Sequence, residues 1–458
     1  MASARNVRLE AVIQELGWSQ DRLAAQIRRV AAEVGADETL SVTRSHISQW
    51  LRGSKPSGRT PAILCEALSR ALGRPVTLAE IGLANDREPT TPGWEVDVLS
   101  ALADSGDPDM ISRRQLLTYS ALGAVPPPPQ WWDERSEHAR TRAPRSPLTV
   151  TPAHVEALRE AMGFFSSRDQ RLGGRAGRAA LRAYLHTDVA AYLDSRMPND
   201  RIRRDLTSAA SELAYLDGWT AFDSGEHGAA QAAFGLALAL AAEADDPALA
   251  AHTLRAQAHQ AVDLGHPAQA LQYAEASMDH RRYTHASNRE RALLGVVHAR
   301  ALAASGRKHD ALAALRRAEN DLAAAGTASD TVEEPARVAF FSEASLAHET
   351  ACTLRDLKDL RGAEKEFERS ARTRKLPYAR THAVTLGYLG DVQARQGHVD
   401  AACATWSTAL DAMAGIQSGR VRDTVVRMRQ ALSPVRGRGG STANALDERA
   451  RQVLTAIG

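Results

Sequence analysis

A short segment near the N-terminus, residues 42–56, carries side chains that can read the edges of base pairs. It runs VTRSHISQWLRGSKP. Arginine can pair with guanine through two hydrogen bonds, glutamine can pair with adenine, and serine can bond to several base atoms. At helical spacing, Val42, Ile47 and Trp50 share one face and would pack inward. The segment therefore predicts a short helix with an apolar face and a polar face suited to the major groove.

The residues expected to contact DNA lie on this helix, just after it, and at the start of the helix before it. Thr43 is a suitable N-cap and Gly53 a suitable helix end. The cations around the helix lie where backbone phosphates would pass. The predicted DNA-binding residues are Gln20, Thr43, Arg44, Ser45, His46, Ser48, Gln49, Arg52, Lys55 and Arg59. The other interpretation is an ordinary amphipathic helix, since Ser, Gln and Arg are common on solvated faces.

The overall charge of the chain does not by itself indicate a nucleic-acid partner. The 458 residues carry a formal net charge of +2, and residues 1–85 contain eleven Lys and Arg against eight Asp and Glu. Affinity for DNA must therefore come from a local basic patch.

The segments on either side of this helix extend the pattern. Residues 18–24, WSQDRLA, supply a serine N-cap, a glutamine that would face a phosphate, and a Leu-Ala packing pair. Residues 63–68 and 72–83 have the apolar pattern of closing helices. Together, residues 6–84 resemble the five-helix domain of XRE-type helix-turn-helix repressors. The resemblance implies an all-α domain whose partner is double-stranded DNA.

One departure from that pattern is the length of the stretch between the two helices of the motif. The stretch of residues 25–41 is much longer than the connection usually found there. Ile27, Val30 and Val34 continue the apolar face of the preceding helix. We expect that helix to be extended and residues 36–41 to form an exposed turn. This long-helix variant resembles a group of actinobacterial XRE regulators with a C-terminal tetratricopeptide (TPR) region. The long connection no longer fixes the angle of the recognition helix.

Residues 86–150 have the composition of a linker with a short helix. We expect the Pro- and Arg-rich stretches 126–129 and 135–147 to be extended or disordered. Their arginines could add phosphate contacts or could simply be solvated. Trp131 and Trp132 are unusual in a linker, and we expect them to be anchored on the C-terminal domain.

From about residue 150 the chain is repetitive. A turn residue recurs with an alanine five positions later, a mostly larger residue after four more, and a small residue after a further three. Another small residue precedes each turn residue by seven positions. Such alternation of small and large residues lets paired helices interlock. The turn residues are Gly225, Gly265, Gly306, Lys358 and Gly397.

These units resemble divergent TPR repeats, with a spacing of about 40 residues rather than 34. The predicted organisation is all-α: a helix-turn-helix domain at 1–85, the linker at 86–150, a TPR-like superhelix at 151–430, and a tail with a final helix at 431–458. An extra helical pair at 152–195 would cap the array. Within it, the Gly- and Arg-rich run 171–178 could hold an anion or form a tight helix-helix turn.

No pattern of catalytic, metal-binding or cofactor-binding residues is visible. The three cysteines are far apart, the histidines are isolated, and there is no P-loop, nucleophile elbow or HExxH. We therefore expect no enzyme activity, no metal and no cofactor. Arg255, Arg300 and Arg337 are the candidates for binding an effector in the TPR groove, if that effector is acidic.

The sequence lacks an N-terminal apolar run and a long hydrophobic span, so we expect no membrane partner. Residues 112–117, SRRQLL, are similar to a twin-arginine export motif. The domain that precedes this motif and the short apolar stretch after it argue for an amphipathic helix instead. The predicted location is the cytoplasm, in association with the nucleoid.

The combined pattern predicts a one-component transcriptional regulator, a homodimer whose TPR region senses a peptide, a small molecule or a protein. Repression is the simplest mode, and the resemblance suggests genes of development or specialised metabolism. The alternative is a TPR scaffold whose helix-turn-helix contacts proteins rather than DNA. An enzyme hidden in the superhelix would require a cluster of acids or histidines on the concave face.

Overall fold

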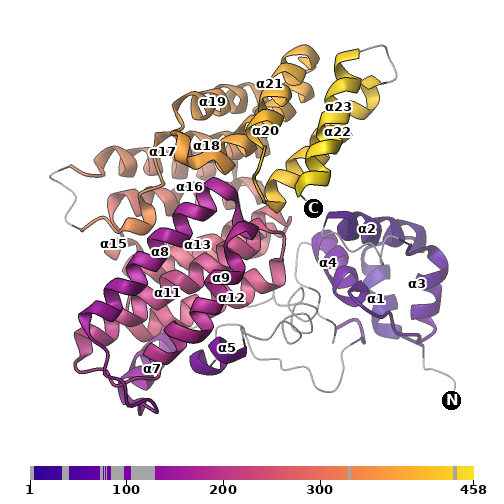
Figure 1. Cartoon of the computed structure of the whole chain (residues 1–458). Coiled ribbons are helices and arrows are strands. Elements are labelled where there is room, and N and C mark those ends of the chain that lie inside the picture. Colours follow the sequence, from indigo (N-terminus) through magenta and orange to yellow (C-terminus); the bar gives the residue numbers. More distant parts are fainter. Residues whose placement is uncertain are drawn as a thin grey trace.

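The computed structural model confirms the expected all-α fold (Figure 1). It describes residues 5–33, 41–72, 76, 78, 80–83, 97–104, 129–327, 332–436 and 441–457. Within these residues, β-structure is limited to one isolated parallel bridge between Thr149 and Arg196. None of the helices described is both long enough and apolar enough to cross a membrane.

The N-terminal domain (residues 5–83) is built around α2 and α4. Leu23 and Ile27 on α2 are completely buried against Leu64 and Leu68 on α4, with Ile47 of α3 in the same core. The α2 helix continues to Glu33, as the apolar spacing predicts. The helices are α1 (Val7–Glu15), α2 (Gln20–Glu33), α3 (Arg44–Leu51) and α4 (Thr60–Leu72).

The expected closing helix over residues 72–83 is not formed by the residues described there. Residues 78 and 80–82 form turns, and Gly82 has a φ of 67°, which ends a right-handed helix. The apolar side chains Val76, Leu78, Ile81 and Leu83 are nevertheless buried in the core of the domain. Hydrophobic spacing thus identified the buried residues correctly and their secondary structure incorrectly.

Part of the linker is helical and packs on the C-terminal region. Short α5 (Val98–Asp104) is followed by α7 (Pro129–Thr141), where the sequence suggested an extended chain. Trp132 is buried and its indole Nε1 donates to Asp245 Oδ1 at 2.9 Å. Arg142 pairs with the buried carboxylate of Glu243 at 2.7 Å. These contacts, whose partners lie far along the chain, stabilise α7 on the C-terminal region. The twin-arginine segment 112–125 lies outside the described residues.

Five antiparallel helix pairs follow one another and form the helical array, defined here as α11 to α21 (Figure 1). The short helix α15 (His280–His285) connects the second pair to the third. The pairs are α11 (Asp200–Asp223) with α12 (His227–Ala244), α13 (Pro247–Asp263) with α14 (Pro267–Ser277), α16 (Asn288–Ala304) with α17 (Lys308–Ala324), α18 (Glu343–Asp356) with α19 (Leu360–Thr373), and α20 (Ala379–Arg395) with α21 (Val399–Ala412).

Further helices lie at the two ends of the array. Before it come α8 (Pro152–Leu172), α9 (Arg178–Tyr184), a π-helical turn (Leu185–Val189) and α10 (Ala190–Leu193). After it come α22 (Gly419–Arg436) and α23 (Ser441–Ile457), which pack against each other. Leu446 and Ala450 of α23 are buried against α21 and α22, so α23 covers the apolar end of the last pair.

The turns inside the five pairs fall on the five positions that the repeat pattern marks. All five residues have positive φ, from 69° at Lys358 to 85° at Gly397. The small residues seven positions earlier make room for bulky partners. A Cβ added at Gly218 would lie 2.5 Å from the Phe234 ring, and one added at Gly390 would lie 2.3 Å from the Trp406 indole.

The Gly- and Arg-rich run 171–178 forms a tight turn against the end of the first pair. The Gly174 amide donates to Asp223 Oδ2 at 2.9 Å, and a Cβ at Gly173 would lie 2.4 Å from the carbonyl oxygen of Gln417. The glycines therefore allow close backbone approach, and the anion that meets Gly174 is a carboxylate of the chain itself.

Replacing Lys358 with glycine is expected to stabilise the protein. Lys358 is held at a φ of 69°, where its Cβ is strained, and glycine removes about 1 kcal/mol or more of that strain. The larger entropy of glycine in the unfolded chain offsets part of this, so we expect a net gain of about 0.5 kcal/mol in urea unfolding. Lys358→Ala is the matched control because it removes the side chain and keeps the strain. A Lys358→Gly protein no more stable than Lys358→Ala would contradict this account.

Candidate nucleic-acid interface and adjoining cavity

The α3 helix begins with a cap formed by its own side chains. Thr43 has an extended conformation, with φ −123°, and its backbone amide donates to His46 Nδ1 at 3.1 Å. The Thr43 hydroxyl lies 3.0 Å from the same nitrogen. At the other end Gly53 has a φ of 103° and stops the helix. His46 thus takes the part that Glu or Gln plays in a capping box.

The residues predicted to read bases share an exposed face of α3. Arg44, Ser45 and Gln49 are exposed, whereas Ile47 and Trp50 are buried in the domain core. The Arg44 side chain is 71% exposed and its nearest acid, Asp21, lies 3.9 Å away. The structure therefore brings the polar residues together on one side and places the apolar residues inside, as helical spacing predicts.

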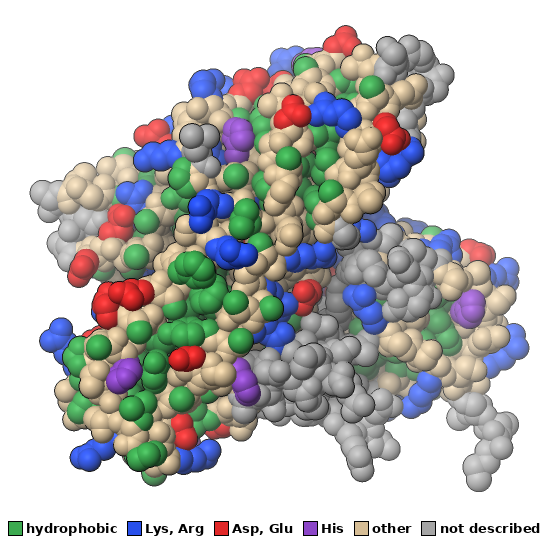
Figure 2. All heavy atoms as spheres, viewed as in Figure 1, with side chains coloured by type: hydrophobic (Ala, Val, Ile, Leu, Met, Phe, Trp, Pro, Cys, Tyr) green, Lys and Arg blue, Asp and Glu red, His purple; other side chains and the backbone are tan. Residues whose placement is uncertain are grey.

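The remaining predicted DNA contacts surround this face. Ser48 is half-buried and its Oγ accepts from Arg52 Nη2 at 2.9 Å, while Arg52 itself is exposed. Lys55 and Arg59 are exposed in the segment between α3 and α4, and Gln20 is half-buried at the start of α2. Figure 2 shows Lys and Arg side chains spread over the surface of the N-terminal domain.

Two residues that the sequence patterns did not single out fix the ends of α3. Arg28 Nη1 on α2 donates to the Val42 carbonyl at 2.6 Å, directly before α3 begins. At the C-terminal end of α3, the backbone amide of Asn6 donates to the Leu51 carbonyl at 2.9 Å. These bonds tie both ends of α3 to the rest of the domain. A half-buried arginine within an amphipathic helix gives no local sequence indication of this role.

The three arginines predicted to bind an effector have different surroundings. Arg255 is buried, with Nη2 2.5 Å from the Tyr215 hydroxyl. Arg337 lies between Glu212 and Glu290, with nitrogen-oxygen distances of 2.9 Å to each. Both are therefore engaged inside the array. Arg300 pairs with Asp263 at 2.9 Å, and of the three it is the one that lines the cavity described next.

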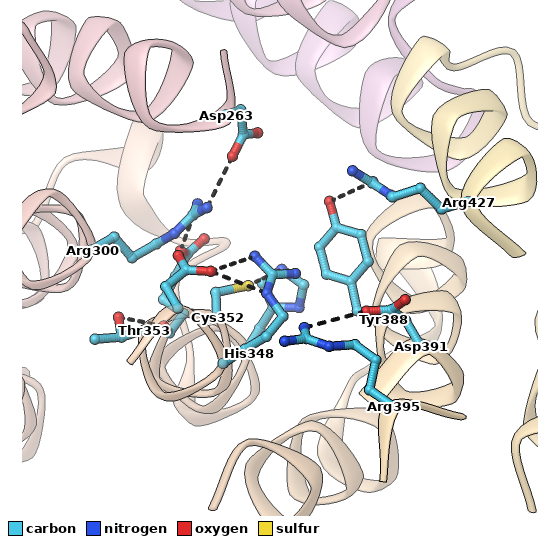
Figure 3. Close-up of polar contacts among 12 residues, drawn as sticks. Asp263, Arg300, His348, Cys352, Thr353, Tyr388, Asp391, Arg395 and Arg427 are labelled. Carbon is cyan, nitrogen blue, oxygen red and sulfur yellow. Dashed lines mark hydrogen bonds and ion pairs between the residues drawn. The ribbon is translucent and has the colours of Figure 1, made fainter. Parts of the chain in front are cut away.

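A cavity of about 940 Å³ lies between the N-terminal domain and the helical array. Its walls come from Trp18 and the α2 and α4 helices on one side, and from the turn after α13, the C-terminal parts of α16, α18 and α20, and α22 on the other. The close-up shows part of this wall, where Arg300 reaches Asp263 and Arg427 reaches the Tyr388 hydroxyl (Figure 3). The sequence patterns did not select Tyr388 or Arg427.

A buried polar contact joins the two sides beside the cavity. His266 Nε2, at the start of α14, lies 3.1 Å from Glu66 Oε1 on α4, and both residues are buried. Arg70 Nε donates to the same carboxylate oxygen at 2.7 Å. Although burial disfavours the charge, His266 and Arg70 together lower the pKa of Glu66 below its usual value. The carboxylate is therefore ionised at neutral pH and holds both domains.

The described residues contain no group of three or more His, Cys, Asp or Glu placed to hold a metal ion. Cys65, Cys352 and Cys403 are buried and form no disulfide. Burial raises the pKa of Cys352 to about 11, which disfavours the reactive thiolate.

Substituting Arg28 with methionine should loosen the start of α3. The change keeps the aliphatic stem and removes the donor to Val42, at an expected cost of about 1 kcal/mol. Amide hydrogen exchange in the first turn of α3 should then become faster than in the wild type. Arg22→Met, on the same helix but stacked on Trp18, should leave that exchange unchanged. Equal protection in Arg28→Met and the wild type would show that the bond does not hold α3.

The buried histidines predict a loss of stability in acid. Burial lowers the pKa of His252 and His298 to about 4, and that of His348 to about 3. The unfolded chain takes up these protons near pH 6.5, so it binds more protons than the folded state below that pH and stability falls as the pH falls. His348→Phe, which retains ring packing on Tyr388, should reduce this slope by up to about 1.4 kcal/mol per pH unit. Urea unfolding between pH 5 and 7 measures it, and equal slopes would rule out the contribution of His348.

Comparison with known proteins finds a match for one part of the chain. A family model described as the SP15 N-terminal domain matches residues 9–84, which contain most of α1 and all of α2, α3 and α4. No curated protein matches the chain.

Proposed function

We propose that this protein is a DNA-binding transcriptional regulator whose N-terminal domain reads the major groove through α3. The observation that carries the proposal is the exposed polar face of α3, with Arg44 and Gln49 on it and buried Ile47 and Trp50 behind it. A helix of this kind fits the major groove, which is about 12 Å wide. Arg52 and Lys55 follow the helix, where they can meet the DNA backbone.

The placement of the N-terminal domain on the array supports this proposal. It is α2 and α4 that line the cavity toward the array, and α3 lies on the opposite side of the domain (Figure 1). The array therefore leaves the polar face of α3 accessible. A domain docked through α3 would instead indicate a role in protein contacts.

One copy of such a domain touches few base pairs, so specific affinity calls for two copies on spaced half-sites. We therefore propose a homodimer that acts in the cytoplasm on the nucleoid, with the helical array sensing an effector. Blocking of promoters is the simplest mode of action, and genes of development or specialised metabolism are the proposed targets. An effector that changes the spacing of the two copies would change occupancy.

The test is whether purified full-length protein selects discrete genomic sites at a stated, near-physiological salt concentration. The variant Arg44→Ala with Gln49→Ala should lose that selection, because each base contact contributes about 1–3 kcal/mol. Lys55→Ala should instead weaken binding to all sequences. It should also reduce by about one the slope of log affinity against log salt concentration, as expected for a phosphate contact. Sequencing of the bound fragments and mobility-shift titrations measure both effects.

Arg372→Ala is the matched control for this experiment, since Arg372 is exposed on α19 in the array. It should bind the same sites with unchanged affinity. If only salt-sensitive background binding is seen, identical in the wild type and the double variant, the protein is better described as a scaffold whose N-terminal domain contacts other proteins.

A further inference from the structure

The cavity between the N-terminal domain and the helical array carries an excess of positive charge. Eight arginines and four aspartates line its walls. Lys and Arg side chains are visible along this junction in Figure 2. A concave, low-dielectric surface lined by one sign of charge concentrates the opposite charge.

Some of these arginines are neutralised within the protein. Arg300 pairs with Asp263 at 2.9 Å. On α20, at the same wall, Arg395 lies 3.7 Å from Asp391 (Figure 3). These ion pairs fix that wall of the cavity, and the arginines in them contribute little to the excess positive charge.

Two other arginines have no such partner. Arg420 has no carboxylate within 4 Å among the described residues: its guanidinium lies 5.8 Å from the centre of the Phe222 ring, and its buried Nε has no hydrogen-bond acceptor there. Arg427 lies 5.2 Å from the centre of the Tyr388 ring, and its Nη2 donates to the Tyr388 hydroxyl at 3.4 Å. It likewise has no ion pair within the described part of the chain.

Both residues lie on one side of α22, seven positions apart, which is two helical turns. Arg420 is half-buried with its Nε fully buried, whereas Arg427 is exposed. A guanidinium stays charged at every physiological pH, so burying the Arg420 Nε without an acceptor is unfavourable. A bound phosphate or carboxylate would remove that penalty, and the planar fork of arginine binds both groups through paired hydrogen bonds. The volume of about 940 Å³ lies within the range of small-molecule sites.

We propose that this cavity binds a small organic molecule with two or more negative charges, carried by phosphate or carboxylate groups, and that Arg420 and Arg427 hold those groups. Tyr388 fixes Arg427, and Arg300 is held by Asp263 at the edge of the same site. The ligand sits between the two domains rather than within the array alone.

The site is connected to the contact between the domains. Arg70 lines the cavity, and its Nε also donates to Glu66, which binds His266 of the array. A polyanion in the cavity attracts Arg70 and so competes with Glu66 for its charge. This coupling rests on the proposed function, because the readout would be a change in how the N-terminal domain presents α3 to DNA.

The binding test uses the full-length protein and three probes: inorganic phosphate, pyrophosphate and citrate. Isothermal titration calorimetry should show pyrophosphate or citrate binding at least tenfold more tightly than inorganic phosphate. A preference for pyrophosphate would indicate a phosphorylated ligand, and a preference for citrate would indicate a polycarboxylate. Arg420→Gln and Arg427→Gln should each weaken binding at least tenfold, and Arg372→Gln on the outer face of α19 should leave it unchanged.

Thermal unfolding separates a ligand-binding role from a structural one. Although burial disfavours the charge, Tyr388, Asp263 and Asp223 raise the pKa of Arg420, so Arg420→Gln without probe should be somewhat less stable than the wild type. If Arg420 holds the ligand, the variant should also lose the stabilisation that the probe gives the wild type. If no probe stabilises the wild type, whatever the stability of Arg420→Gln, Arg420 has only a structural role beside Phe222 and the proposal is overturned.

The coupling is tested by repeating the DNA titration with saturating probe. We expect an affinity change of at least threefold in the wild type and no change in Arg420→Gln. Calorimetric binding without any DNA binding would leave the ligand site standing and overturn the proposed function. Site-specific DNA binding with no calorimetric signal for any probe would do the reverse.

Discussion

The buried ion pair between Arg380 and Asp169 is the contact on which the arrangement of the array depends. It joins α20 to α8 across 211 residues of sequence, with a distance of 2.8 Å, and Asp223 shares the guanidinium at 3.3 Å. Asp223 also accepts from the Ser418 hydroxyl at 3.0 Å, directly before α22. Burial raises the pKa of Asp169 to about 6; the charge of Arg380 opposes this rise and that of Asp223 adds to it. Removing Arg380 would leave both acids buried without their cation, which is strongly destabilising.

Local patterns predicted the parts of this molecule whose structure is set locally. The turn at Lys358 could be predicted although it holds no glycine, because the spacing of the small residues around it matches the other four pairs. Helical periodicity and the N-cap residue Thr43 predicted α3 and its exposed face. In both cases a few neighbouring residues determine the conformation.

Contacts between distant residues could not be predicted in this way. Residues 135–147 were expected to be extended or disordered, but residues 135–141 form the second half of α7, because Trp132 and Arg142 find partners more than 100 residues later. Arg300 of the cavity was among the predicted effector-binding residues, but Arg420 and Arg427 were missed for the same reason. They lie on an amphipathic helix whose polar face looks solvated in the sequence, and only the packing of other elements makes that face part of a cavity. Arg337, by contrast, looked available but is neutralised by two acids from other helices.

The position of α23 limits how copies of this protein can assemble. A stack of helical pairs ends in an apolar face that another stack could join, and open-ended joining of that kind produces filaments. Here Leu446 and Ala450 of α23 cover that face at the C-terminal end. Growth from that end is therefore blocked. If copies of the protein assemble, the contact has to use a surface other than that covered end, and this favours a closed pair over a chain of copies.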